Sequence, residues 1–218
     1  MTPQMGLTGS AVLFVGLHFL LSHPLRAPMV RALGEKGFRG LYSLVALIAF
    51  GAMIYFYHVI GDEPQLWTPG EAAHVAATLL MWLGAILFVG SFVGNPALPG
   101  ARSASGPPRG VFAITRHPMM WGFGLWAVVH LMIVATPKAL VFDGAILLLA
   151  IAGSAMQDRK KSGIMGESWH EWKAQTGFWP FARGAAWPGL AAFVGGTLLL
   201  LIASWAHPLP VGPWRWIG

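Results

Sequence analysis

The chain of 218 residues contains no cysteine. This absence excludes disulfide bonds, a cysteine nucleophile, haem ligation through a thiolate, and iron–sulfur clusters held by cysteine. A metal ion or a haem in this protein would therefore be held by histidine, methionine or a carboxylate.

Charged residues are also scarce: they make up 10% of the chain, while hydrophobic residues make up 56%. Soluble domains contain about 25% charged and roughly 45–50% apolar residues. The net charge of +6 is concentrated between long apolar runs, so it indicates orientation in a membrane and not binding to nucleic acid. Several of the eleven Trp lie at the ends of these runs, at the expected level of the lipid headgroups: Trp67, Trp187, Trp205 and Trp214.

Crossing a hydrocarbon core of about 30 Å takes roughly 20 apolar residues. Six stretches are suitable: residues 6–22, 40–60, 72–94, 117–136, 138–157 and 187–206. We therefore expect an all-α, polytopic membrane protein with six transmembrane helices, forming a single domain over residues 1–218. No Lys or Arg precedes the first run and no small-residue cleavage pattern closes it, so we expect a retained helix and not a signal peptide.

The basic residues predict the orientation of these helices. Twelve Lys and Arg lie in three alternate connections, residues 23–39, 95–116 and 158–186, and only two lie in the other connections and termini. By the positive-inside rule, the three basic connections face the cytoplasm and both termini are periplasmic. Gly and Pro cluster in residues 95–110, which predicts a cytoplasmic loop that could act as a lid.

Two histidines stand out, because an ionisable side chain inside a span costs at least a few kcal/mol unless it is paired or hydrated. Of eight His, only His18 and His130 lie well inside spans. Phe14 and Ser22 share the helix face of His18, and Trp126 shares that of His130. One interpretation is a pair of core histidines, each hydrogen-bonded to a backbone carbonyl or a Ser. The other is ligation of a metal or a haem, since the chain offers no other soft ligand except Met.

The expected depths of these groups differ. At about 1.5 Å per residue, His130 lies several ångströms deeper than His18, so tilt or a kink would have to bring the two together. Asp143, the one carboxylate within a span, falls at the expected level of His130. It could accept the second ring N–H of a ligating histidine, or it could be interfacial and hydrated.

The most specific local pattern is residues 110–122, in which Arg116 and His117 precede Pro118. Proline favours the first turn of a helix, and a helix N-terminus attracts anions. We expect Arg116 and His117 to bind an anionic group at the cytoplasmic edge, such as a haem propionate or a substrate carboxylate.

Several motifs occur in the order of one known family: Gly16-Leu17-His18-Phe19-Leu20, Leu25-Arg26-Ala27, Leu33-Gly34-Glu35-Lys36-Gly37, Leu41-Tyr42-Ser43-Leu44, Asn95-Pro96, Thr115-Arg116-His117-Pro118-Met119, and Leu125-Trp126-Ala127 with His130-Leu131. With these motifs the chain resembles the NnrU family of bacterial inner-membrane proteins, which includes an isomerase branch acting on 15-cis-zeta-carotene.

The resemblance implies a haem b in the helix bundle, held by two histidines whose matching positions are His18 and His130. Arg116, His117 and Trp126 are the residues expected to contact this cofactor. It further implies an inner-membrane location, and either cis–trans isomerisation of an apolar polyene or an accessory role in nitrite and nitric oxide reduction. The expected partners are the lipid bilayer and an apolar or lipidic small molecule.

The C-terminal half is also similar to the isoprenylcysteine carboxyl methyltransferases. The resemblance is carried by Arg116-His117-Pro118, Gln157-Asp158, Gly166, Trp169, Trp172 and Pro180-Phe181. It implies binding of S-adenosylmethionine and methylation of a lipidic acceptor. The chain departs from that family at Gln157-Asp158, where an acidic pair is usual, and at Met119-Met120, where an aromatic is usual. A third possibility is a scaffold or assembly protein without a cofactor.

Overall fold

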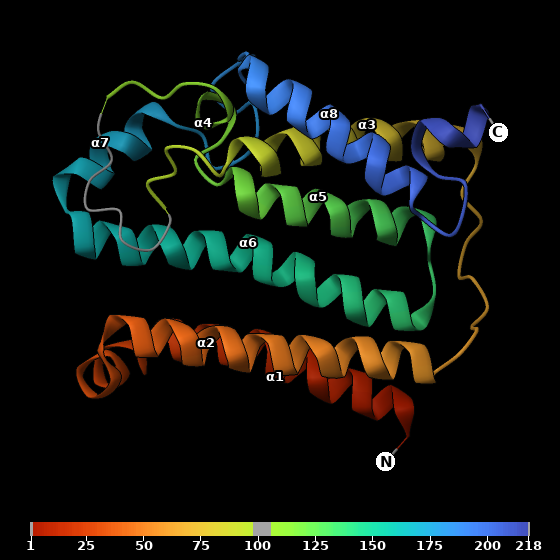
Figure 1. The fold of residues 1–218 in the computed structure, drawn as a ribbon, viewed down its shortest axis with the longest axis horizontal. Helices are drawn as coiled ribbons and strands as arrows, with labels where there is room; N and C mark the ends of the chain where they lie inside the picture. The colour runs from red at the N-terminus through yellow and green to blue at the C-terminus, as the bar shows by residue number, and fades with distance from the viewer. Residues whose placement is uncertain (1, 98–105, 218) are drawn as a thin grey trace. The chain divides into compact units, whose positions relative to one another are not determined.

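The computed structural model describes residues 2–97 and 106–217, and every regular element within them is helical. The prediction of an all-α protein is confirmed for these residues. Residues 98–105 of the predicted Gly- and Pro-rich loop lie outside the described residues. The elements are α1 (Pro3–Ser22), α2 (Arg26–Val59), α3 (Glu71–Gly90), α4 (Val111–Ile114), α5 (Pro118–Ile133), α6 (Pro137–Met165), α7 (Glu167–Gln175), α8 (Leu190–Trp205) and the 3-10 helix η1 (Gly212–Trp216) (Figure 1).

The chain divides into two compact units, each described here by itself. The first unit comprises Met1–Thr68 and Val134–Leu149, and the second comprises Pro69–Ile133 and Ala150–Gly218. The first unit therefore contains α1, α2 and the beginning of α6. The second contains α3, α4, α5, the end of α6, α7, α8 and η1.

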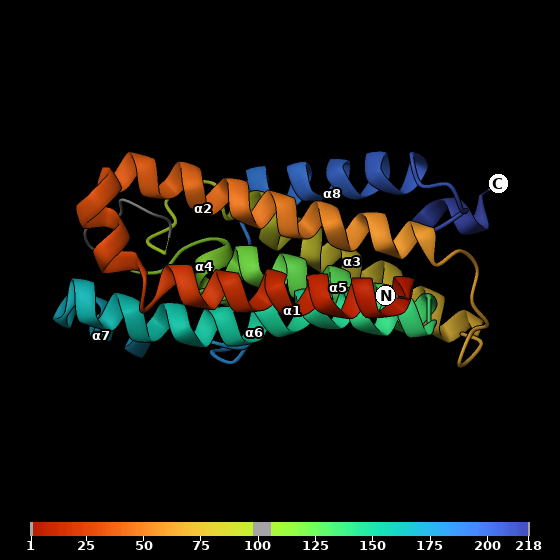
Figure 2. The same ribbon diagram turned by 90° about the horizontal axis from the view of Figure 1, so that it is seen from below.

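In the first unit, α1 and α2 run side by side in opposite directions (Figures 1 and 2). Gly6 permits their close approach, because a Cβ atom at this position would lie 2.4 Å from the ring of Phe56. The helical run of α2 contains a break at Gly34, with φ of 70° and ψ of 168°, a conformation that favours glycine. Beyond the end of α2, the amide of Leu66 donates to the carbonyl of Ala135 at 2.7 Å, which fixes the connection against the start of α6.

In the second unit, α3 packs against both α5 and α8. Small residues allow these contacts: a Cβ atom on Gly196 of α8 would lie 2.4 Å from the Cα atom of Ile86, and one on Gly122 of α5 would lie 3.1 Å from the carbonyl oxygen of Gly84. Close backbone approach at small residues is typical of helix packing in membranes.

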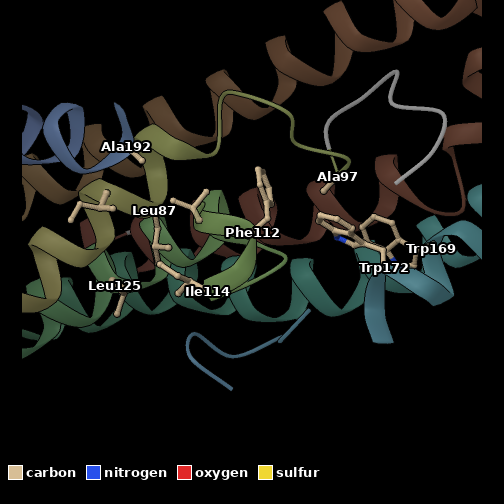
Figure 3. Close-up of a cluster of buried hydrophobic side chains, with 10 residues drawn as sticks. Leu87, Ala97, Phe112, Ile114, Leu125, Trp169, Trp172 and Ala192 are labelled. Carbon is tan, nitrogen blue, oxygen red and sulfur yellow. The ribbon is translucent and has the colours of Figure 1, made fainter. Parts of the chain in front are cut away.

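The apolar core of the second unit joins these helices to α4 and α7. Leu87, Leu125 and Ile114 lie at one end of the cluster in Figure 3, and Trp169 and Trp172 of α7 lie at the other, beside Ala97. Trp169 is fully buried. The short helices α4 and α7 are thus held by side-chain burial, which is necessary because isolated helices of this length are unstable in water.

Among the residues that the structure describes, four helices, α1, α2, α3 and α6, are long and apolar enough to cross a membrane by length and composition. They also expose large apolar side chains, such as Leu47 at 70% and Ile48 at 64% on α2. Such surfaces indicate a membrane protein, since a bilayer and not water suits them.

The helices α5 and α8 are apolar but only 16 residues long, about 24 Å at the usual rise per residue. The predicted spans over 117–136 and 187–206 were longer. The helix α5 ends at Ile133, and residues 134–136, which have no regular structure, separate it from Pro137 at the start of α6. The helix α8 starts only after Pro188 and Gly189, whose φ is 90°. Six spans and periplasmic termini stay predictions.

Candidate functional site

His18 lies on α1 in the first unit and is half-buried. Its Nδ1 is 2.6 Å from the carbonyl oxygen of Phe14, one helical turn earlier. The imidazole is enclosed by two aromatic rings in edge contact, Phe14 at 4.5 Å and Tyr42 of α2 at 5.4 Å between ring centroids. Because a carbonyl oxygen only accepts, Nδ1 is the donor, and in the neutral imidazole Nε2 carries the lone pair.

His130 lies on α5 in the second unit and has the same local arrangement. Its Nδ1 is 2.8 Å from the carbonyl oxygen of Trp126, again four residues earlier. The Trp126 ring lies against the imidazole, with 4.0 Å between centroids and 33° between planes. Trp126, predicted to contact a cofactor, therefore contacts the imidazole of His130.

These hydrogen bonds bear on both interpretations of the two histidines. A core histidine paired with a backbone carbonyl has this geometry. A ligating histidine has it as well, because metal-bound imidazoles almost always donate their second N–H to a carbonyl or carboxylate. The hydrogen bond of each imidazole, taken by itself, is therefore compatible with a haem ligand that would bind through Nε2 in its neutral form.

Asp143 on α6 belongs to the first unit and is only 4% exposed. Its neighbour Phe142 packs on Phe50 and Tyr57 of α2, with centroids 5.8 and 5.3 Å apart. The Nδ1–H of His130 goes to Trp126 and not to a carboxylate. A backbone carbonyl therefore accepts the Nδ1–H of His130. Accepting this proton was one of the two roles considered for Asp143.

Arg116 and His117 lie in an extended link between α4 and α5. Thr115 ends α4 with φ of −155° and ψ of 149°, and Pro118 begins α5, so the residue before it is biased toward extended conformation. Backbone bonds hold the link: the amide of Arg116 donates to the carbonyl of Gly177 at 2.9 Å. Both side chains are thereby turned toward the interior of the second unit, where Arg116 is 8% and His117 is 2% exposed.

The two side chains converge on Asp158 of α6. Arg116 donates from Nε to both carboxylate oxygens at 3.0 and 2.9 Å, and from Nη2 to Oδ2 at 2.6 Å. Its Nη1 donates to the carbonyl of Thr176 at 3.2 Å. His117 donates from Nε2 to Oδ1 of Asp158 at 3.0 Å. We call Arg116, His117 and Asp158 the buried ion cluster.

In this cluster the charge of Arg116 is compensated by Asp158, and the guanidinium also stacks over the Phe178 ring at 5.4 Å. The cluster therefore ties α6 to the link before α5 and to the segment after α7. The expectation that Arg116 and His117 bind an anionic group stays a prediction. Sequence reasoning missed Asp158 as their partner, although an acidic residue at the end of an apolar span and before a basic stretch was a usable signal.

Three buried polar atoms of the second unit have no hydrogen-bond partner among the described residues: Nδ1 of His117 and Nε1 of Trp169 and Trp172. Buried polar groups are nearly always paired, so each such atom is a place where a ligand or water could bind. No group of three or more His, Cys, Asp or Glu that could hold a metal occurs in the described part of the chain.

Comparison with known proteins gives one family and two relatives. The model of the NnrU protein family matches residues 6–214. The chain is 25% identical over 207 residues to the chloroplastic 15-cis-zeta-carotene isomerase of Zea mays, covering 85% of this chain and 55% of that protein. It is 25% identical over 237 residues to the isomerase of the same name from Arabidopsis thaliana, covering 97% of this chain and 62% of that protein. The chain thus spans less than two thirds of these relatives, and no solved structure matches it significantly.

Proposed function

Because the chain belongs to the NnrU protein family, we propose that it binds a b-type haem through His18 and His130 and isomerises a cis double bond in an apolar polyene. The observation that supports the proposal is the hydrogen bond that each imidazole makes within its own helix. Each donates Nδ1–H to the carbonyl four residues earlier and leaves Nε2 as the ligand atom. The relatives named as isomerases support the reaction class.

The residues around each histidine orient it for ligation. A hydrogen bond from Nδ1 to a carbonyl fixes the tautomer and makes Nε2 more basic. Phe14 and Tyr42 restrict rotation of the His18 ring, and Trp126 does the same for His130. When bound, the haem supplies an iron centre that can share electron density with a conjugated chain and so weaken a cis double bond. A polyene can approach from the bilayer, since the apolar faces of the long helices are exposed.

The proposal is tested by adding 15-cis-zeta-carotene to purified protein in liposomes and separating the isomers by chromatography. The wild-type protein should isomerise the central double bond, while His18→Ala and His130→Ala should not. His58→Ala is the matched control, because this residue lies at the end of α2. If haem-loaded protein leaves the polyene unchanged, the proposed isomerase activity is refuted, and an accessory role in nitrite and nitric oxide reduction is favoured. If haem-free protein isomerises the polyene, the proposed role of the haem in the reaction is refuted.

A second function is favoured by the buried ion cluster and the unpartnered atoms beside it. His117, Trp169 and Trp172, which carry the resemblance to methyltransferases, all have a buried polar atom without a partner among the described residues. S-adenosylmethionine has both donors and acceptors that could pair with them. Calorimetric binding of S-adenosylmethionine to colourless protein, lost in a Trp172→Phe variant, would favour this function.

A further inference from the structure

The segment between α7 and α8 contains a strained turn. Phe181 has φ of 62° and is the single non-glycine residue with positive φ in the described part of the chain. Such a conformation is a genuine outlier for a bulky aromatic residue. Strain of this kind persists where surrounding contacts impose it, and it gathers at functional positions. We call residues 179–183 the aromatic turn.

Hydrogen bonds impose the conformation of this turn. The amide of Phe181 donates to the carbonyl of Ile114 at 3.0 Å, and its carbonyl accepts from the amide of Gly184 at 2.9 Å. Just before the turn, Nε1 of Trp121 donates to the carbonyl of Phe178 at 2.8 Å. The turn is therefore fixed on the ends of α4 and α5.

The fixed turn exposes aromatic side chains. Trp179 is 55% exposed and Phe181 is 43% exposed, and Arg183 is also exposed. Trp187, which also lies in the segment between α7 and α8, is 60% exposed. Because these rings are exposed, burial inside the protein does not offset the strain of the turn.

The surroundings of the turn in the chain match a membrane surface. The apolar helix α8 begins at Leu190, a few residues after the turn, and no acidic residue follows Glu171 in the sequence. The turn also belongs to the connection at 158–186, one of the three predicted from their basic residues to face the cytoplasm. Its positive charge complements the anionic lipids of the cytoplasmic leaflet.

We propose that the aromatic turn is a lipid-binding device that inserts Trp179 and Phe181 among the headgroups of the cytoplasmic leaflet, while Arg183 pairs with an anionic lipid phosphate. Aromatic rings are suited to this depth, and a nearby cation adds affinity for anionic lipid. The device is independent of haem and of any reaction, and it fixes the edge of the second unit at the bilayer surface.

Because the chain contains no cysteine, a spin label can be attached at a single introduced cysteine in the intact chain in liposomes. Ala182→Cys places a label in the turn, and Ala174→Cys is the matched control on α7, since both alanines are exposed. The collision rate of each label with oxygen, which concentrates in lipid, is compared with that for a water-soluble nickel chelate. The Ala182→Cys label should favour oxygen several-fold, and more strongly when phosphatidylglycerol is added to phosphatidylcholine. The Ala174→Cys label should favour nickel.

Two further variants separate the contribution of the Phe181 ring to lipid insertion from that of the Arg183 charge. Phe181→Gly accepts the same φ without strain but lacks the ring, so it should move the Ala182→Cys label toward water without loss of helix content. Arg183→Gln should abolish only the response to phosphatidylglycerol. A label that favours nickel in every liposome would overturn the proposal. So would a label shielded from both reagents in detergent without lipid, because that result indicates a protein contact.

Discussion

Replacing Asp158 by Asn tests whether the buried ion cluster stabilises the second unit. Asp158 is 7% exposed and receives hydrogen bonds from both Arg116 and His117. Asp158→Asn removes the negative charge and leaves the guanidinium buried without compensation. Breaking a buried pair in this way costs about 3–5 kcal/mol, a large fraction of the roughly 5–15 kcal/mol that stabilises a typical protein.

Removing both charges should be much less harmful than removing one. In an Arg116→Met/Asp158→Leu double variant no uncompensated charge is left, and replacing a buried ion pair by apolar residues is often close to neutral. The exposed pair of Arg215 and Glu71, 2.6 Å apart, provides the control. Glu71→Gln should change stability far less, because solvent screens exposed charges.

The assay is the free energy of unfolding in a mild detergent, followed by circular dichroism as denaturant is added. The predicted order is wild type close to Glu71→Gln, the double variant slightly lower, and Asp158→Asn lowest. If Asp158→Asn has the same free energy of unfolding as Glu71→Gln, or if the double variant loses as much stability as Asp158→Asn, the ion cluster does not have the stabilising role assigned to it.

Two further predictions concern packing and orientation. Gly196→Ala should lower the free energy of unfolding by about 1–3 kcal/mol through overpacking, because its Cβ would lie 2.4 Å from the Cα atom of Ile86; Gly51→Ala, where no atom lies within 4 Å, is the control, and an equal loss in both would contradict the contact. A reporter enzyme fused after residue 218 should be active only if it is a periplasmic reporter, because the basic connections are predicted to face the cytoplasm; activity of a cytoplasmic reporter alone would contradict the predicted orientation.

The sequence predicted the helical class and the positions of the apolar helices, because long runs without charge are explained by a bilayer and by little else. It predicted the ends of α5 and α8 less well. Hydrophobicity continues through Val134 and Ala135, whereas the helix stops at Ile133. The carbonyl of Ala135 accepts from the amide of Leu66 instead, a contact that no local pattern encodes.

The candidate site was only partly accessible to sequence reasoning. His18 and His130 were identified by their rarity within apolar runs, and a backbone carbonyl was among the partners considered for each. The partnership of Arg116 with Asp158 spans 42 residues and depends on how α6 packs, which no local pattern encodes. The strained conformation of Phe181 was equally hidden, because it arises from a hydrogen bond to Ile114.

The central claim, that His18 and His130 ligate one haem, is tested most directly by the absorption spectrum of purified protein expressed with adequate haem. Two neutral imidazole ligands predict a Soret band of a six-coordinate, low-spin b-type haem at one haem per chain. His18→Ala and His130→Ala should each lose the haem or convert it to a high-spin form, while His58→Ala and His207→Ala should keep the wild-type spectrum. A wild-type spectrum in both His18→Ala and His130→Ala, or a colourless wild-type protein, would contradict the claim.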